Sequence, residues 1–452
     1  MITVEDRELS ISTEDYSLLT DLYQLTMAAC YAGENLANKP ASFELFVRSL
    51  PEEFGYLIAA GLAQVLDYLA KLHFNSSQIS SLKQTGIFDR APEKFWSNLA
   101  KARFTGDVWA VPEGTAIFAN EPILRIEAPL WQAQLIETYI LNTINYQTLI
   151  ATKAARMRDV AGEKAKLLEF GTRRAFSPQG AIWAARAAIA GGMDATSNVL
   201  AALKLGRKPS GTMAHSLVMA IQATSGSEME AFNAFNRYFP DAALLIDTYD
   251  TIAAAKQLAE MVKQNKIKVA GVRIDSGDLL ELSKAVKSIL PDTNIFVSGD
   301  LDEWEINRLK AGDASVDGYG IGTKLVSGKP VNGVYKLVEI DSIPTMKESK
   351  NKATYPGRKQ IFRSYNNNLI SRDRLALASE TPEANERPLL QLMMKQGQAT
   401  KEQENLATIS KRTAKTLSSL SLECRQIDRP QPITVEISQS LEQLRLSLIT
   451  RK

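Results

Sequence analysis

The sequence predicts an α/β fold in which parallel strands alternate with helices, and three observations point to it. Short apolar runs end in small or polar residues, and each is followed by a stretch with helical spacing. Four of these polar ends, at positions 247, 275, 300 and 323, lie 28, 25 and 23 residues apart, about one strand–helix unit each. At 452 residues the chain also exceeds one ordinary core, so we expect two domains or a large barrel with a satellite domain.

Residues 1–150 are expected to form an N-terminal α+β domain, because helical and strand-like patterns follow one another there. The successive patterns are helical at 20–30, strand-like at 41–47, helical at 61–71, extended with turns at 107–127 and helical at 130–158. Thr20 and Asp21 stand directly before the first helical stretch, as is typical of a helix start.

Residues 151–330 carry the strand–helix rhythm and are expected to form a catalytic α/β barrel. Polar residues follow five of the strand-like runs, at Gly171–Arg174, Asp247–Asp250, Asp275–Asp278, Ser298–Asp300 and Gly322–Lys324. Aspartate and glycine at such places often only cap the next helix or form a turn. In a closed barrel, however, chemistry gathers where the strands end. Four strand ends in series carry such residues and a fifth strand end carries arginines. Together they favour an active site over simple helix capping.

Residues 331–452 are expected to form a C-terminal segment. Strand-like patterns cover 334–340 and 359–363, and helical spacing returns at 435–448. Between them, residues 376–415 are polar and rich in Glu, Lys, Gln and Thr, a composition typical of partly mobile surface. We therefore expect a polar, partly mobile tail over residues 376–452.

Composition excludes several classes of protein. The 53 basic and 51 acidic residues leave a formal net charge of +2, which argues against a nucleic-acid partner. No run of about 18 apolar residues occurs, so no membrane span is expected. Cys30 and Cys424 are too far apart in sequence for a disulfide framework or a metal motif, and the N-terminus lacks the pattern of a signal peptide. A cytoplasmic protein is expected.

Histidine is scarce, since only His73 and His215 occur. His73 stands near the end of a helical pattern, where a packed or capping histidine is expected. His215 follows the small, hydrogen-bonding segment Ser210–Ala214, whose amides and hydroxyls can hold phosphate oxygens. Imidazole can act as a base or as a nucleophile that accepts a phosphoryl group. His215 is therefore the candidate catalytic residue, with a purely structural histidine as the alternative.

Two further strand ends have the composition of a phosphate or metal site. Arg273 precedes Asp275 and Asp278, so that carboxylates suited to hydrated Mg²⁺ lie beside a guanidinium suited to phosphate or carboxylate. A turn with an internal ion pair is the alternative. Residues 318–323 place three glycines before a helical pattern, where bare amides can form a phosphate cradle, although tight packing would explain them equally.

Two aromatic residues are candidates for stacking on a flat heteroaromatic ring. Tyr23 lies in the first helical stretch and Phe170 ends a barrel strand. On spacing alone, both would be assigned to the core.

Taken together, these segments resemble the nicotinate phosphoribosyltransferase family over roughly residues 15–365. The matching segments are Thr20–Thr26, Glu169–Ala175, Gly191–Leu200, Ser210–Ser216, Gly271–Leu279, Ser298–Glu303, Gly320–Lys324 and Tyr355–Lys359. The resemblance implies an irregular α/β barrel beside an α+β domain built from both ends of the chain. It also implies an enzyme of NAD salvage that joins nicotinate to phosphoribosyl pyrophosphate, giving nicotinate mononucleotide and pyrophosphate, with ATP as co-substrate and Mg²⁺ as cofactor.

Residue roles follow from the same resemblance. It implies that His215 becomes a phosphohistidine and that Tyr23 and Phe170 sandwich the pyridine ring. The basic groups that hold the substrate carboxylate and phosphates match Arg173 and Arg273. The remaining matches are ligand-binding Thr212, the acids Asp247, Asp275 and Asp300 with Gly299 around ribose, pyrophosphate and metal, and the 5′-phosphate cradle Gly322–Thr323. A homodimer is a further possibility, in which Tyr23 would serve a neighbouring subunit.

The nearest alternative is a nicotinamide phosphoribosyltransferase, which shares the fold and the histidine. Counted without gaps from Phe170, the aspartate that favours nicotinamide in those enzymes would fall near Thr196. A threonine there leaves no anion to repel nicotinate, which favours nicotinate as the substrate. A catalytically silent relative that only binds pyridine nucleotides is the alternative of a different class, but His215 and the acids are all present.

Overall fold

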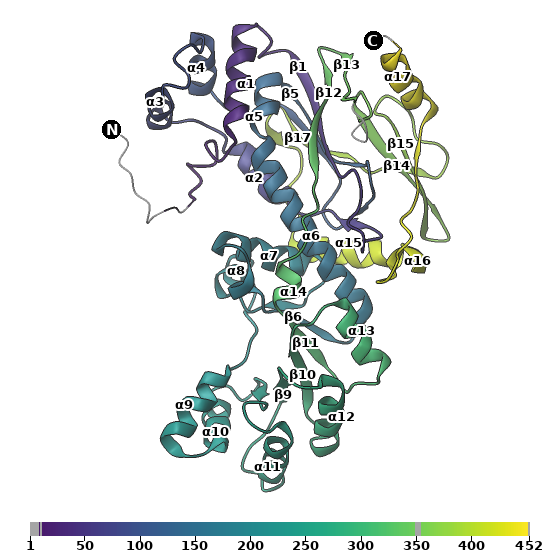
Figure 1. The fold of residues 1–452 in the computed structure, drawn as a ribbon. Helices are drawn as coiled ribbons and strands as arrows, with labels where there is room; N and C mark the ends of the chain where they lie inside the picture. The colour runs from purple at the N-terminus through teal and green to yellow at the C-terminus, as the bar shows by residue number, and fades with distance from the viewer. Residues whose placement is uncertain (1–8, 10, 349–353, 451–452) are drawn as a thin grey trace. The chain divides into compact units, whose positions relative to one another are not determined.

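The structure is a computed structural model that describes residues 9, 11–348 and 354–450. The chain divides into two compact units (Figure 1). Unit 1 combines Met1–Leu149 with Pro330–Lys452, and unit 2 is Ile150–Lys329. These divisions lie next to the domain boundaries expected after residues 150 and 330.

Unit 2 is built around a six-stranded sheet in which every ladder is parallel. In spatial order the strands are β7 (Ala195–Thr196), β6 (Lys166–Glu169), β11 (Gly318–Ile321), β10 (Asn294–Gly299), β9 (Gly271–Ile274) and β8 (Leu244–Leu245). Helices connect most of these strands, namely α7 (Pro178–Ala190), α8 (Val199–Lys204), α9 (His215–Ser225), α10 (Glu228–Tyr238), α11 (Thr251–Lys263), α12 (Leu279–Ile289) and α13 (Glu303–Ala311). The prediction of parallel strands alternating with helices is confirmed.

The two edges of this sheet, β7 and β8, are not joined by a strand–strand ladder among the described residues. The extended segment before α9 connects them instead. The Ser210 amide donates to the Thr196 carbonyl of β7 over 2.9 Å, and the Thr212 hydroxyl donates to the Ala243 carbonyl beside β8. An irregular barrel is compatible with this arrangement, although the hydrogen bonds do not close it as a regular one.

Several aspartates at the strand ends cap the following helices. Asp250, Asp278 and Asp302 each accept a backbone hydrogen bond from the first turn of α11, α12 and α13, respectively. These caps satisfy amide donors that a helix start would otherwise leave unpaired. Each capping aspartate follows a predicted site aspartate by two or three positions, so capping is the role of the second acid of each pair.

Unit 1 contains a seven-stranded sheet and a four-stranded sheet. The larger sheet runs β13 (Ile343–Pro344), β12 (Val334–Ile340), β1 (Pro40–Phe46), β5 (Pro122–Pro129), β3 (Asp107–Ala110), β17 (Gln391–Lys395) and β18 (Gln398–Ala399). The smaller sheet runs β16 (Glu386–Pro388), β14 (Lys359–Asn366), β15 (Leu369–Leu377) and β19 (Val435–Ile437). Because β1 pairs with both β5 and β12, the two ends of the chain share one sheet, which confirms the second α+β domain.

Helices of unit 1 cover its core. The chain forms α1 (Leu22–Gly33), α2 (Leu62–Ala70), α3 (Ser76–Gln84), α4 (Glu93–Ala100), α5 (Leu130–Leu135), α15 (Leu406–Ser418), α16 (Leu422–Arg425) and α17 (Gln439–Ile449). The long α6 (Glu137–Ala161) begins in unit 1 and ends in unit 2. Leu25 and Ala28 of α1 join an apolar cluster with Trp96 and Trp131. Apolar burial of this kind is the main stabilising contribution to the unit.

The expectation of a partly mobile polar tail stays a prediction, but much of this stretch forms regular secondary structure. Residues 376–415 include β16, β17, β18 and most of α15. On α15 the buried residues are Ile409, Thr413 and Leu417, spaced four apart on one face. Only three positions of this helix are buried. Because most of its residues are polar, composition alone did not reveal the amphipathic spacing.

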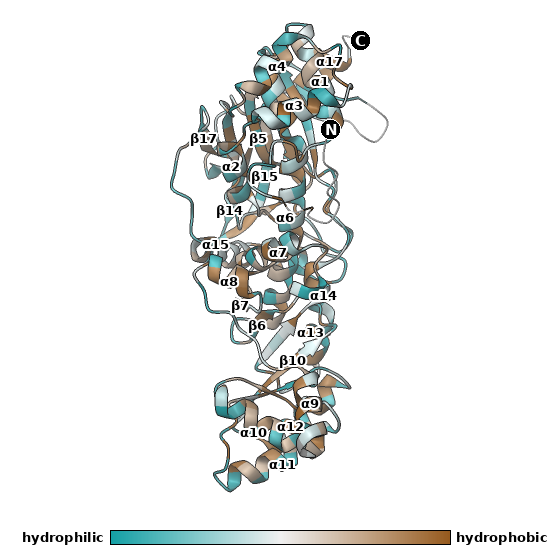
Figure 2. Cartoon of the chain, turned by 90° about the vertical axis from the view of Figure 1, so that its left-hand side faces the viewer, coloured by the Kyte–Doolittle hydropathy of each residue, from teal (hydrophilic) through white to brown (hydrophobic). Residues whose placement is uncertain are grey.

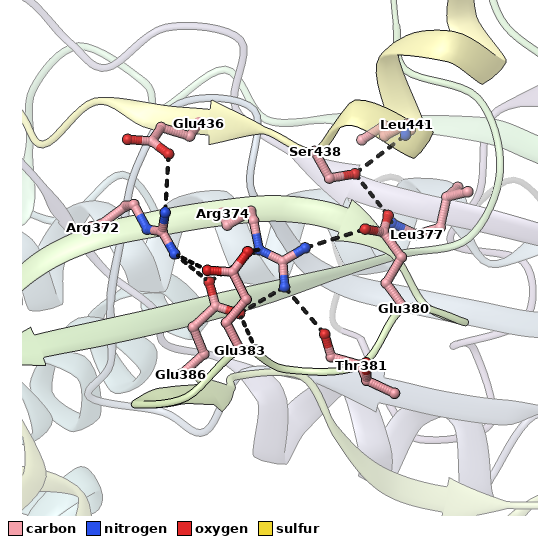
Figure 3. Close-up of polar contacts among 10 residues, drawn as sticks. All are labelled: Arg372, Arg374, Leu377, Glu380, Thr381, Glu383, Glu386, Glu436, Ser438 and Leu441. Atoms are coloured by element: carbon pink, nitrogen blue, oxygen red, sulfur yellow. Dashed lines mark hydrogen bonds and ion pairs between the residues drawn. The ribbon is translucent and has the colours of Figure 1, made fainter.

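The four-stranded sheet of unit 1 carries a network of ion pairs (Figure 3). Arg374 donates to both carboxylate oxygens of Glu386, at 3.0 and 2.6 Å, and to Glu380 at 3.2 Å. Arg372, whose side chain is 33% exposed, contacts Glu383, Glu386 and Glu436. The glutamates come from β16, β19 and the turn between β15 and β16, so the network joins strands that are distant in sequence.

Hydrophilic and hydrophobic residues alternate along most helices, as expected where one face packs inward (Figure 2). Within the described ranges, no helix is both long and apolar enough to cross a membrane.

Candidate active site

The predicted site residues of unit 2 lie where its parallel strands end. Phe170 directly follows β6, Asp247 follows β8 by two residues, and Asp275 directly follows β9. Gly299 is the last residue of β10, and Gly322 directly follows β11. Because the carboxyl ends of parallel strands share one edge of a sheet, these five positions are brought to the same edge.

Phe170 is held by the backbone of the neighbouring strand. Its amide donates to the Ile321 carbonyl over 2.7 Å. A Cβ on Gly320 would lie 2.5 Å from the Phe170 ring, so glycine is required there for the ring to lie against β11. A Cβ on Gly171 would lie 2.2 Å from the Val326 side chain. Glycine is therefore also required at the start of the turn that follows Phe170. Arg173 lies in that turn, within the short 3₁₀ helix Thr172–Arg174, and is exposed.

His215 is the first residue of α9 and faces the end of β8. Its Nδ1 lies 3.2 Å from the Thr248 hydroxyl, and its Nε2 lies 3.9 Å from Asp247 Oδ1. The imidazole is 39% exposed, whereas the Asp247 side chain is 2% exposed. The imidazole is therefore accessible from solvent on one side and has a buried carboxylate on the other.

Asp247 joins two strand ends. Its Oδ2 accepts hydrogen bonds from the Asp275 amide at 2.9 Å and from the Ser276 hydroxyl at 2.6 Å. Its buried Oδ1 has no hydrogen-bond partner among the described residues, and that oxygen faces His215. An acceptor left unsatisfied in a buried position costs stability, so Asp247 Oδ1 can accept a hydrogen bond from a bound ligand.

Arg273 extends from β9 toward the segment that carries His215. It donates to the Met213 carbonyl over 3.1 Å, while its buried Nε has no partner among the described residues. Burial lowers the pKa of Arg273 against the opposing effect of Asp275 and Asp247, and Arg173 lowers it further. Arg273 is therefore affected electrostatically by both carboxylates and by the second guanidinium group, that of Arg173.

A pocket of about 480 Å³ opens beside the ends of β9 and β10. Asp275, Gly299 and Asp300 are among its lining residues. Ser298 donates a hydrogen bond to Asp275, which fixes that carboxylate at the rim. Gly299 has φ +121°, and a Cβ there would lie 3.0 Å from the Asp275 carbonyl, so this turn requires glycine. Exposed Asp300 follows it directly.

The predicted phosphate cradle is a tight turn into a single helical turn. Gly322 is the N-cap of α14 (Thr323–Val326), and its neighbour Thr323 is the first residue of that helix. A Cβ on Gly322 would lie 3.6 Å from the Phe170 carbonyl. The candidate phosphate position therefore adjoins the candidate ring position.

Two predicted residues have other surroundings. Thr212 donates its hydroxyl to the Ala243 carbonyl, so this side chain links the two edges of the sheet. Tyr23 lies on α1 in unit 1, whereas every other predicted site residue belongs to unit 2. Its ring is 46% exposed, and burial of the hydroxyl, with the charges of Glu137 and Asp21, raises the pKa of Tyr23 to about 12.

The sequence patterns missed three polar residues of this edge: Thr248, Ser298 and Glu228. Thr248 and Ser298 stand beside predicted acids at strand ends, so their position was a usable signal. Glu228, on α10, had none. Its Oε1 is buried without a partner among the described residues, and burial together with the charges of Asp247 and Asp250 raises its pKa.

Comparisons with known proteins show the family to which the chain belongs. Three family profiles match: the nicotinate phosphoribosyltransferase N-terminal domain at 18–145, the nicotinate phosphoribosyltransferase family at 165–365, and the C-terminal domain at 383–445. The chain is 42% identical to nicotinate phosphoribosyltransferase pncB2 of Mycobacterium tuberculosis over 370 residues, covering 79% of this chain and 78% of the relative.

A relative from Bacillus subtilis, also named nicotinate phosphoribosyltransferase, is 38% identical over 472 aligned residues that cover 96% of this chain and 95% of the relative. The crystal structure of human nicotinic acid phosphoribosyltransferase matches with a TM-score of 0.83 at 30% identity, covering 95% of this chain and all of that one. Similarity of this extent covers both units. The chain therefore belongs to the nicotinate phosphoribosyltransferase family.

Proposed function

We propose that the protein condenses nicotinate with phosphoribosyl pyrophosphate to nicotinate mononucleotide and pyrophosphate, coupled to ATP hydrolysis through a phosphohistidine at His215. The observation that carries this proposal is the position of His215 over buried Asp247, 3.9 Å away, at a strand edge that also holds Arg273 and Asp275. Relatives named nicotinate phosphoribosyltransferase support nicotinate over nicotinamide as the substrate.

In the proposed reaction the nicotinate ring nitrogen attacks the anomeric carbon as the bond to pyrophosphate breaks. The Phe170 ring, held against Gly320, provides a flat surface on which the pyridine can stack. Arg173 and Arg273 bind the substrate carboxylate and phosphates, which fixes the ring at attack distance. Positive charge that develops on the ribose is stabilised by the nearby carboxylates, Asp247 and Asp275.

The acids at the ends of β9 and β10 fit the proposed Mg²⁺. Asp275 and Asp300 line one pocket, and Mg²⁺ is usually held by one or two carboxylates together with substrate phosphates. When bound, the ion would neutralise charge on the departing pyrophosphate. The chain's own part is to hold these carboxylates in place through Ser298 and Gly299.

ATP coupling is assigned to His215. Its imidazole is accessible, and Thr248 and Asp247 contact its two nitrogens. A phosphoryl group on this ring would add negative charge beside the substrate site. We expect that charge to order the site and to tighten the binding of phosphoribosyl pyrophosphate.

We also propose a homodimer in the cytoplasm. Val199, Leu200 and Leu203 of α8 are 59%, 51% and 65% exposed, and Figure 2 shows this helix as largely hydrophobic. Such exposed apolar faces are typical of association surfaces. Exposed Tyr23 would then serve the site of a neighbouring subunit. Sedimentation velocity tests the assembly, and a monomer at micromolar concentration would contradict it.

A steady-state assay tests the activity. Nicotinate and nicotinamide are each supplied with phosphoribosyl pyrophosphate and Mg²⁺, with and without ATP, and mononucleotide and ADP are quantified. We expect turnover of nicotinate that ATP stimulates. Absence of mononucleotide from both bases would refute the enzyme, and turnover of nicotinamide alone would move the assignment to the nicotinamide enzymes.

A further inference from the structure

Glu169, the last residue of β6, is a buried carboxylate with both oxygens engaged. It is 1% exposed and directly precedes Phe170. Its Oε1 accepts the Gly171 amide, and its Oε2 accepts the Thr196 hydroxyl. Burial raises the pKa of Glu169, and the two donors oppose this increase. Burying an ionisable carboxyl group costs folding free energy, so the two hydrogen bonds that Glu169 accepts indicate a specific role for this side chain.

Thr196 is the centre of the same network. It is 1% exposed, and its hydroxyl, besides donating to Glu169, accepts the Asn198 amide at 2.9 Å. Asn198 in turn caps α8 through the Ala201 amide at 2.9 Å. The Glu169 carbonyl accepts the Ser197 amide at 2.9 Å, so side chains and backbone join the same two strand ends.

The Thr196 backbone extends this network to the histidine segment. Its carbonyl accepts the Ser210 amide at 2.9 Å. Five residues later the chain reaches His215, after the Met213 carbonyl has accepted a hydrogen bond from Arg273. Thr196 thus contacts, through its hydroxyl, the Glu169 carboxylate that accepts the Gly171 amide of the turn after β6. Through its carbonyl it contacts the segment that leads to His215.

We propose that Glu169 and Thr196 form a positioning pair that holds the pyridine-binding turn, Phe170–Arg173, in register with the histidine segment, Ser210–His215. This inference rests on the proposed function. The pair couples nicotinate binding to the use of the phosphohistidine, because the turn is bonded to Glu169, Glu169 is bonded to Thr196, and Thr196 is bonded to the histidine segment. Glu169 and Thr196 act through Phe170 and His215 and do not themselves take part in bond breaking.

The test compares Thr196→Val, which is nearly isosteric but removes the hydroxyl, with Thr196→Ser, which retains it. We expect Thr196→Val to raise the KM for nicotinate about tenfold or more, because the buried Glu169 carboxylate loses a donor. We also expect it to raise the ADP formed per mononucleotide about threefold or more. Thr196→Ser should restore both quantities to within about twofold of the wild type.

Thr143→Val is the matched control. Thr143 is likewise fully buried, and its hydroxyl has no hydrogen-bond partner among the described residues. This variant should leave the KM and the ADP ratio unchanged. Glu169→Gln provides a second route should Thr196→Val fail to fold, because the amide has no net charge and can keep one of the two bonds. It should change both quantities in the same direction by a smaller factor.

Several outcomes would overturn the inference. One is a Thr196→Val protein with a lower melting temperature but an unchanged KM and ADP ratio, which would leave a structural role only. Another is a Thr143→Val protein that changes as much as Thr196→Val. Wild-type protein that makes no mononucleotide would refute the proposed function instead, so the two failures are distinguishable.

Discussion

Charged side chains with buried atoms are fully paired at Arg363 and Asp373 in the four-stranded sheet of unit 1, whereas at the strand edge of unit 2 they are only partly paired. In unit 1 buried Arg363 donates to both oxygens of Asp373, at 2.8 and 2.5 Å. In unit 2 buried Asp247 and partly buried Arg273 each retain a buried side-chain atom without a partner among the described residues. A buried charge that is paired supports the fold, and one left partly unpaired provides binding capacity at a cost in stability.

The difference between these two regions predicts which variants affect activity and which affect stability. Removing a charged group from the strand edge should reduce catalysis and leave the free energy of unfolding nearly unchanged. Removing one from the ion pairs of unit 1 should have the reverse effect. The following variants test this division, in order of decreasing expected effect.

His215→Ala should abolish ATP hydrolysis and leave only slow, ATP-independent synthesis of mononucleotide. The reason is that no other imidazole is available at the strand edge, since His73 belongs to unit 1. The measurements are ADP release and acid-labile phosphate on the protein. Normal ATP hydrolysis by this variant would exclude the phosphohistidine.

Arg363→Met should destabilise the protein by about 3–5 kcal/mol, because it leaves buried Asp373 and Glu121 without a cation. Denaturant unfolding measures the loss. The double variant with Asp373→Leu should recover part of it. An unfolding free energy within about 1 kcal/mol of the wild type would show that this pair contributes little to stability.

Asp275→Asn should lower kcat about 100-fold, since it removes a negative charge at the point where cationic charge develops, yet preserves an acceptor for Ser298. Its unfolding free energy should stay within about 0.5 kcal/mol of the wild type. The result that contradicts the comparison is the opposite one: a stability loss of several kcal/mol with normal kcat.

Glu121→Gln should stabilise the protein increasingly as pH rises. Burial, followed by the charge of Asp373, raises the pKa of Glu121 well above its ordinary value of 4.5. The folded wild type therefore retains a proton that the unfolded chain has released, so its stability falls as pH rises above 4.5. Glutamine has no such proton. Denaturant unfolding at a series of pH values above 4.5 should show the stability of the variant, relative to the wild type, increasing with pH. A pH-independent difference would contradict the raised pKa.

Arg372→Met should cost less than about 1 kcal/mol, because this arginine is partly exposed and solvent weakens its three ion pairs. Arg374→Met is the matched comparison (Figure 3). The Arg374 side chain is 9% exposed and holds Glu386 through two hydrogen bonds, so its removal should cost more. Equal losses of melting temperature for the two variants would show that burial does not decide the strength of these pairs.

Much of the fold and of the site could be predicted from the sequence. Strand–helix spacing identified five of the six parallel strands described in unit 2, all but the two-residue β7. The residues at the ends of the predicted strands included Asp247, Asp275 and Gly299. Parallel topology alone carries such residues to one edge, so no three-dimensional information was needed to group them. The resemblance to a family added the residue roles, which spacing cannot supply.

Only the tertiary structure shows which of two neighbouring aspartates caps a helix and which faces His215. Asp247 and Asp250 are both aspartates after the same strand, yet one faces His215 and the other caps α11. The link from Glu169 to Thr196 and the ordered α15 were likewise absent from the sequence patterns. Local spacing records which residues are apolar and where chain direction changes. It does not record which donor meets which acceptor 27 or more positions away, and such contacts separate an acid that caps a helix from one that faces His215.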